Sequence, residues 1–227
     1  MPHRQRIGEC VYCRKNGHVT NDHVPPKCLF PPAVRVNLVT VNACPKCHNE
    51  FKLDDEYFRV ILSLRIDLPE GEDADYIRDQ TVKGLRDPKG RNFLASIKSK
   101  AGTLPFYSPS GAYVGNVPTL QVDAGRLRST AERIVCGLFS KYLRHSVPAT
   151  HEVTVSVLDL QKDDSALYSP EVAAMLSELR VRGRRHQFGN VLDVWFVSTV
   201  DDLESTMWFV NLHRVFAFIG FTAPRDG

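Results

Sequence analysis

The chain has 227 residues, of which 43% are hydrophobic, 24% charged and 9% aromatic, and its formal net charge is +3. This is the composition of an ordinary globular protein, and it excludes collagen, coiled coil and intrinsic disorder. No stretch approaches the roughly 18 apolar residues of a membrane span, and no apolar segment follows the charged N-terminus, so we expect a cytoplasmic protein with no membrane partner.

Residues 1–52 are rich in Cys, Pro, Asn and β-branched residues and show no helical periodicity. We expect loops and short strands there, organised around a metal ion. A helix should follow, because Asp54 and Asp55 can cap it and the apolar positions between Phe58 and Ile66 recur at spacings of three and four. This helix should stop before Pro69 and pack on the metal-binding segment.

Residues 68–118 are polar and are predicted to connect two larger parts. Helices are expected near 73–86 and 90–100. The stretch from Gly102 to Pro118 contains Ser-Pro-Ser-Gly, which is typical of turns, and we interpret it as a linker or long surface loop.

The last part, residues 119–227, mixes helical and strand-like patterns. Helices are predicted at 125–145 and 170–181, and strands at 119–122 and 152–158 and within two longer runs, 191–200 and 205–221. These patterns predict an antiparallel sheet of three or four strands with helices against one face. The fold class is therefore α+β, with three parts, 1–67, 68–118 and 119–227, the last of unassigned role.

Two Cys-x2-Cys pairs lie in the first 47 residues, Cys10 with Cys13 and Cys44 with Cys47. A disulfide framework is typical of small secreted chains, whereas thiols of a cytoplasmic protein remain available as thiolates for metal. The two pairs predict a four-cysteine structural zinc site. His18 or His48 in place of one cysteine is the alternative ligand set.

Charge is distributed unevenly along the chain. Residues 1–52 carry eight Lys and Arg against three Asp and Glu, while the remainder carries 21 against 23. A basic N-terminal segment favours a polyanionic partner, because cationic side chains that contact phosphates release counterions. The candidate nucleic-acid contacts are Arg14, Lys15, Lys27, Lys46 and Lys52.

Between the cysteine pairs lies Asp22-His23-Val24-Pro25, and His48 follows the second pair. Thirty residues separate Cys13 from Cys44, more than the about 15–20 of a generic zinc ribbon and enough for a β-hairpin with polar side chains. Hydrolysis of a phosphodiester needs a base that works near neutral pH, which a histidine is, and a divalent cation, which a carboxylate and an imidazole can hold. Adjacent residues of a strand face opposite ways, so we expect an irregular backbone at Asp22 and His23 rather than a regular central strand.

Over residues 8–60 the sequence resembles the HNH endonuclease family, in the order of its two cysteine pairs, its Asp-His-Val-Pro motif and its Cys-Pro-Lys-Cys-His segment. The resemblance implies a treble-clef-like ββα-metal module that hydrolyses nucleic acid, most often DNA. It assigns His23 as the general base, and Asp22 and His48 as ligands of catalytic Mg²⁺ or another divalent ion. The four cysteines would bind the structural zinc.

The family's central asparagine, which holds the loop that bears the base, corresponds to Asn37 or to Asn42. Family members of this size act in phage defence, restriction or mobile elements. The alternative function is a non-catalytic zinc-ribbon protein that binds nucleic acid or acts as an adaptor, and residues 119–227 could bind a protein partner in either case.

Overall fold

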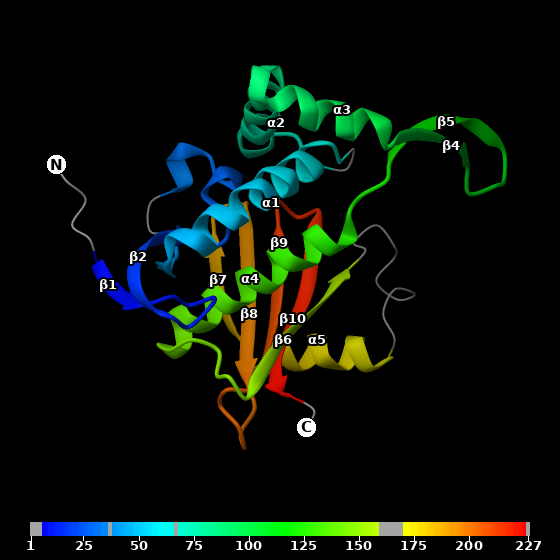
Figure 1. Cartoon of the computed structure of the whole chain (residues 1–227). Helices are drawn as coiled ribbons and strands as arrows, with labels where there is room; N and C mark the ends of the chain where they lie inside the picture. The colour runs from blue at the N-terminus through cyan, green and yellow to red at the C-terminus, as the bar shows by residue number, and fades with distance from the viewer. Residues whose placement is uncertain (1–5, 36–37, 66–67, 159–169, 226–227) are drawn as a thin grey trace.

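A computed structural model describes residues 6–35, 38–65, 68–158 and 170–225. This part of the chain is mixed α+β, with five α-helices and antiparallel sheets, as the sequence predicts (Figure 1). Among these residues, no helix is both long enough and apolar enough to cross a membrane.

The N-terminal sheet has the strand order β1 (Arg6–Glu9), β2 (Asn16–His23), β3 (Thr40–Ala43). The longest strand, β2, pairs antiparallel with both neighbours. Helix α1 (Pro45–Ser63) begins directly after β3, with a proline in its first turn. Short strands are therefore present in the first 52 residues, as expected, but the prediction that Asp54 and Asp55 cap the helix is wrong, because the helix begins at Pro45 and both residues lie within it.

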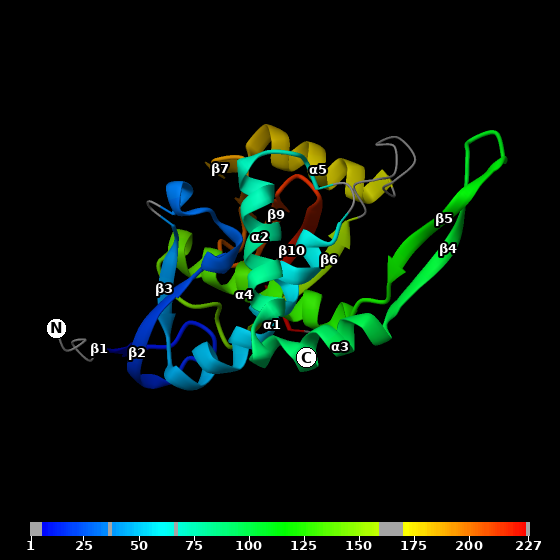
Figure 2. The same ribbon diagram turned by 90° about the horizontal axis from the view of Figure 1, so that it is seen from above.

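Helices α2 (Glu72–Arg86) and α3 (Arg91–Ser99) confirm the two helices predicted in the connector. The prediction of a loop from Gly102 to Pro118 is wrong, because β4 (Ala101–Tyr107) and β5 (Tyr113–Leu120) form an antiparallel ribbon. The Ser-Pro-Ser-Gly sequence lies at the tip of this ribbon. These four residues do lie in a turn, as predicted. The β-branched and aromatic residues on either side of the turn, however, pair with each other as two strands (Figure 2).

The C-terminal sheet has five strands rather than three or four. Their order is β6 (His151–Leu158), β10 (Phe216–Pro224), β9 (Thr206–Leu212), β8 (Leu192–Ser198), β7 (Arg184–Phe188). The run 205–221 is divided between two strands, because His213 and Arg214 adopt positive φ angles and reverse the chain. The additional edge strand is β7, in a basic segment that lacks an apolar alternation.

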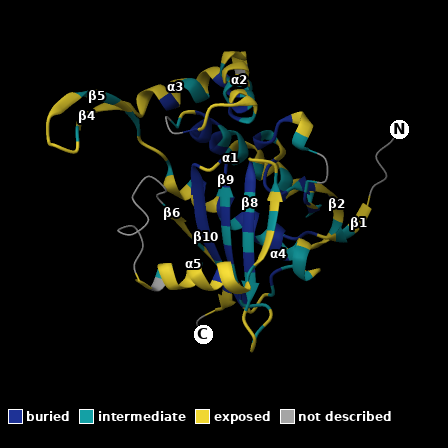
Figure 3. Ribbon diagram, turned by 180° about the vertical axis from the view of Figure 1, so that it is seen from behind, coloured by how far each residue is buried: buried dark blue, intermediate teal, exposed yellow. Residues whose placement is uncertain are grey.

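The prediction that helices cover one face of this sheet is also wrong. Helix α4 (Ala124–Leu143) packs on one face, where it contacts β6 and β10. Helix α5 (Pro170–Arg182) lies on the opposite face, against β8 and β9 (Figures 1 and 3). Strand β10 is buried on both faces, as Ala217 and Ile219 alternate with Phe216 and Phe218 and all four are buried. A strand of this kind needs cover on both sides.

A single hydrophobic core joins the N-terminal sheet and α1 to the C-terminal sheet. The ring of Phe58 in α1 meets the ring of Phe216 in β10 edge to face, with centroids 4.8 Å apart. Helix α4 lies between the two parts, and at Gly137 it approaches so closely that an added Cβ would be 2.4 Å from a methyl group of Val24. The division into parts at 67 and 118 stays a prediction, whereas the packing shows that the first and third parts bury their apolar surfaces together.

Candidate functional site

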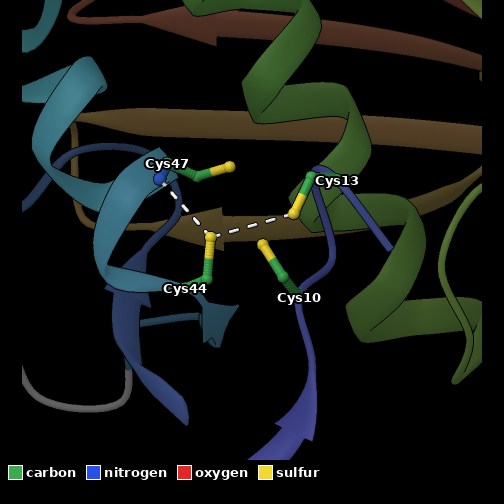
Figure 4. Close-up of side chains that lie close together, drawn as sticks. All are labelled: Cys10, Cys13, Cys44 and Cys47. Atoms are coloured by element: carbon green, nitrogen blue, oxygen red, sulfur yellow. Dashed lines mark hydrogen bonds between the residues drawn. The ribbon is translucent and has the colours of Figure 1, made fainter. Parts of the chain in front are cut away.

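The two cysteine pairs meet at one point of the N-terminal sheet (Figure 4). Cys10 and Cys13 lie in the turn after β1, where the Arg14 amide donates to the Cys10 carbonyl at 2.7 Å. Cys44 is the N-cap of α1 and Cys47 lies in its first turn. The spacing of each pair is thus set by a local turn, and β3 brings the two turns together.

The geometry of this cluster fits a tetrahedral zinc ion. The four sulfur atoms all lie within 4.8 Å of one another, and Cys13 Sγ and Cys44 Sγ are 3.8 Å apart. A tetrahedral ion with Zn–S bonds of about 2.3 Å requires sulfur atoms about 3.8 Å apart. The described residues place no histidine in this group, so the cluster follows the four-cysteine prediction rather than the alternative with His18 or His48.

The electrostatics of the cluster also suit a cation. The amide of Cys47 donates to Cys44 Sγ and lowers the pKa of that thiol to about 7. Burial raises the pKa of Cys10 and Cys47, so these thiols resist ionisation without a positive partner. Four sulfur atoms this close can all become thiolates only when a metal ion compensates their charge.

Asp22, His23 and His48 border one open cleft of about 430 Å³, at the end of β2 and beside the first turns of α1. The expectation of an irregular backbone at Asp22 and His23 is wrong, since β2 remains paired with β3 through Asp22–Val41 and His23–Thr40. Both side chains can border the same cleft because His23 is the last residue of the strand. Side chains of adjacent residues point to opposite faces of a sheet, but at the end of a strand both can reach the space beyond the sheet.

The carboxylate of Asp22 is almost fully buried, and among the described residues only one of its oxygens accepts hydrogen bonds. Its Oδ2 accepts hydrogen bonds from Tyr12 Oη at 2.6 Å and from Arg133 Nη1 at 3.1 Å. Burial, followed by the charge of Asp22, raises the pKa of Tyr12, so the phenol remains a donor. The other oxygen, Oδ1, faces Nδ1 of His48 at 3.7 Å.

His48 has an unsatisfied nitrogen at this point. Its Nδ1 is buried and has no hydrogen-bond partner in the part of the chain that the structure describes. Ligand atoms bound to an octahedral Mg²⁺ at about 2.1 Å lie about 3.0 Å apart when adjacent and about 4.2 Å apart when opposite, and the separation of 3.7 Å matches neither distance. A side chain would therefore have to move by roughly 0.5–0.7 Å for Asp22 and His48 to bind one such ion.

His23 is half-buried beside this pair. Burial, and then the charge of Lys27, lowers the pKa of His23, so its imidazole is neutral at physiological pH. A neutral imidazole can accept a proton from water, which is the property required of a general base.

Of the two candidates for the central asparagine, Asn37 lies outside the described residues. Asn42 lies in β3 opposite Asn21, and its Oδ1 accepts a hydrogen bond from Arg6 at 2.8 Å. Asn42 therefore supports the hairpin of β1 and β2, and it does not border the cleft of His23.

The five basic residues predicted to contact nucleic acid do not all border one cleft. Lys27 and Lys52 border the cleft. Lys46 pairs with Glu50 in α1, and Arg14 and Lys15 are exposed in the turn of the first cysteine pair, where Arg14 borders a separate cleft.

Sequence reasoning missed the residues that hold Asp22 in place. Arg133 of α4 is buried and donates both to Asp22 and to Asp55 of α1, while its guanidinium lies 4.7 Å from the centre of the Phe51 ring. The sequence feature that could have indicated Arg133 is its position within the apolar run of α4. Its partners could not be inferred, because they lie about 80 and 110 residues away in the sequence. Arg59 also borders the cleft, and its buried Nε has no partner among the described residues.

No family model, curated protein or solved structure matches this chain.

Proposed function

We propose that the protein is a metal-dependent endonuclease of the HNH type, with a treble-clef-like zinc module at its N-terminus. The observation that carries the proposal is the buried Nδ1 of His48, which has no hydrogen-bond partner among the described residues and faces Oδ1 of Asp22 at 3.7 Å, beside a neutral His23. Buried polar atoms normally have a partner, and an unpaired one at a cleft marks a site for a ligand. Metal-dependent hydrolysis of a phosphodiester requires a general base and, next to it, side chains that bind the divalent ion.

In this proposal each residue has a separate task. Asp22 and His48 hold a divalent ion, Mg²⁺ or another, which when bound stabilises the charge that develops on the phosphate. His23 takes a proton from the attacking water. Lys27 and Lys52, at the border of the same cleft, attract the phosphate backbone of the substrate, for which we propose DNA.

The zinc cluster has a structural task. It fixes the turn of β1 and β2 against the first turn of α1, and this sets the position of His48 relative to Asp22. Arg133 and Tyr12 then hold Oδ2 of Asp22, which leaves Oδ1 directed at His48. Catalytic geometry would thus depend on a metal that takes no part in the chemistry.

The experiment is a nicking assay on supercoiled plasmid with Mg²⁺ or Mn²⁺ and with EDTA. We expect cleavage that requires metal and that falls by roughly 10²–10⁴ in His23→Ala, the usual contribution of a general base. His18→Ala is the matched control, since His18 lies exposed in the same strand and outside the cleft. Binding of DNA without metal-dependent cleavage would favour the alternative of a non-catalytic zinc-ribbon protein.

A further inference from the structure

A second group of potential metal ligands lies in the C-terminal part of the chain. His151 is the first residue of β6, and Asp202 and Glu204 belong to the loop that joins β8 to β9, at the same end of the sheet (Figure 1). One nitrogen of the histidine and one oxygen of each carboxylate all lie within 4.8 Å of one another. Because His151 and Asp202 are 51 residues apart in the sequence, only the fold brings these ligand atoms together.

His145, in the segment between α4 and β6, faces the same group. Its Nε2 lies 3.8 Å from Oε1 of Glu204. Its Nδ1 lies 3.0 Å from the carbonyl oxygen of Ser146, which can only accept a hydrogen bond, so the neutral ring carries its proton on Nδ1. Nε2 then has a lone pair that faces a carboxylate, and two acceptors that face each other need a cation between them.

The ring of His151 is held in a similar way. Its Nε2 lies 2.9 Å from Oδ2 of Asp202, and its Nδ1 lies 3.0 Å from Oγ1 of Thr150. A hydroxyl oxygen can accept the Nδ1 proton, which leaves Nε2 able to bind a metal ion. Histidines that bind metal generally donate their other ring N–H to an oxygen of the protein, and both histidines have such an oxygen in place.

The carboxylate of Asp202 is fixed by its own loop. Its Oδ2 accepts a hydrogen bond from Ser205 Oγ at 2.6 Å, and its Oδ1 accepts one from the amide of Glu204 at 3.0 Å. Carboxylates that bind metal are commonly oriented by hydrogen bonds of this kind. The side chain of His151 is 7% exposed, whereas those of Glu204 and His145 are 41% and 47% exposed, so a fixed pair is accompanied by two side chains that can adjust.

We propose that these residues form a second zinc site, with four ligands: His145, His151, Asp202 and Glu204. Two imidazoles and two carboxylates suit Zn²⁺ better than Mg²⁺, which prefers oxygen ligands throughout. With both imidazoles neutral, the two carboxylates balance the charge of the ion.

The distances are compatible with tetrahedral coordination after small movements. Zinc with bonds of about 2.0–2.1 Å places its ligand atoms about 3.3 Å apart. The ligand atoms of His151 and Asp202, now at 2.9 Å, would separate by about 0.4 Å. Those of His145 and Glu204, now at 3.8 Å, would approach by about 0.5 Å, which exposed side chains can do. An ion bound there would join the segment after α4 to the loop between β8 and β9, and with four protein ligands its role would be structural.

The test is the zinc content of the full-length protein, equilibrated with about 10 μM free Zn²⁺. It is performed in the His48→Ala background, which removes a ligand of the ion proposed for the cleft of Asp22. Adding His145→Ala/Glu204→Gln takes away two exposed ligands of the second site, so we expect the zinc content to fall by one ion per chain and the affinity for that ion to fall at least tenfold. This difference is expected whatever the four cysteines bind.

A matched control and a thermal measurement complete the test. His18→Ala/Glu50→Gln removes an exposed histidine and an exposed glutamate from outside the site and should leave the zinc content unchanged. Free Zn²⁺ at about one hundred times the dissociation constant should raise the Tm of the His48→Ala protein by roughly 5–10 °C, and should not do so after His145→Ala/Glu204→Gln.

Two results would overturn the proposal. One is an equal zinc content with and without His145→Ala/Glu204→Gln, which would leave these residues as ordinary ion pairs. The other is a His48→Ala protein whose Tm does not respond to added Zn²⁺. Neither readout depends on whether the protein cleaves DNA.

Discussion

Replacing the buried guanidinium of Arg133 tests whether its ion pairs with Asp22 and Asp55 stabilise the site. Its side chain is 4% exposed and pairs with Asp22 and Asp55, whose side chains are 10% and 20% exposed. Arg133→Met retains much of the apolar stem and leaves both carboxylates without their cation. Removing one partner of a buried ion pair costs about 3–5 kcal/mol, because the remaining charge stays desolvated. For a protein of this size we expect a fall in Tm of roughly 6–20 °C.

The same helix provides the matched control. Arg126 of α4 pairs with Asp54 of α1 at 2.6 Å, but these side chains are 30% and 28% exposed. Arg126→Met should therefore cost about 1 kcal/mol or less, because solvent screens the pair. Thermal and urea unfolding of both variants, in excess zinc, measures the difference.

A double variant identifies the source of the loss. In Arg133→Met/Asp55→Asn one of the two uncompensated carboxylates becomes neutral, so we expect part of the lost stability to return. If Arg133→Met unfolds at the same temperature as Arg126→Met, or if Asp55→Asn adds its full cost to that of Arg133→Met, the reasoning is refuted.

Three further predictions concern the zinc, the two histidines of the cleft and the pH dependence of stability. Cys44→Ser should release the zinc and unfold the N-terminal sheet, since structural zinc contributes on the order of 10 kcal/mol in small sites; a variant that retains zinc by metal analysis would contradict this. The cleavage defect of His48→Ala should be partly relieved by higher metal concentration, whereas that of His23→Ala should not, as rates measured against metal concentration will show. Burial lowers the pKa of His213, whose Nε2 bonds to the carbonyl of Leu29 at 2.9 Å, so below about pH 6.5 the unfolded chain takes up a proton that the folded chain resists. The free energy of unfolding should then fall with decreasing pH by up to about 1.4 kcal/mol per unit, and His213→Asn, which tolerates the φ of 52°, should flatten this slope in urea unfolding at pH 5–7.

Some features of the site could be predicted because their cause is local. Each Cys-x2-Cys pair belongs to one tight turn or one helix start, so its spacing alone indicates a pair of ligands. Asp22 and His23 are adjacent, and His48 follows the second cysteine pair by one residue. The resemblance of these motifs to the HNH family selected the three residues, but it did not show that β2 stays regular through both Asp22 and His23.

The C-terminal sheet shows where local patterns were insufficient. The run 205–221 is strand-like throughout, and the turn at His213 and Arg214 lacks the glycine or asparagine that usually marks positive φ. The burial of β10 on both faces and the position of α5 against β8 and β9 both depend on how the strands are ordered. Likewise, the ribbon of β4 and β5 becomes apparent only when two stretches on either side of a turn are paired.

The sequence by itself determined the α+β class and the two cysteine pairs, because these depend on residue chemistry at short spacing, and its resemblance to the HNH family selected the candidate base and metal ligands. The tertiary structure alone decided that Arg133 reaches Asp22 from more than 100 residues away, and that Oδ2 is held while Oδ1 faces His48. The physical reason is that a buried charge must be compensated wherever the fold brings a partner to it, and no local pattern in a sequence records which partner that will be.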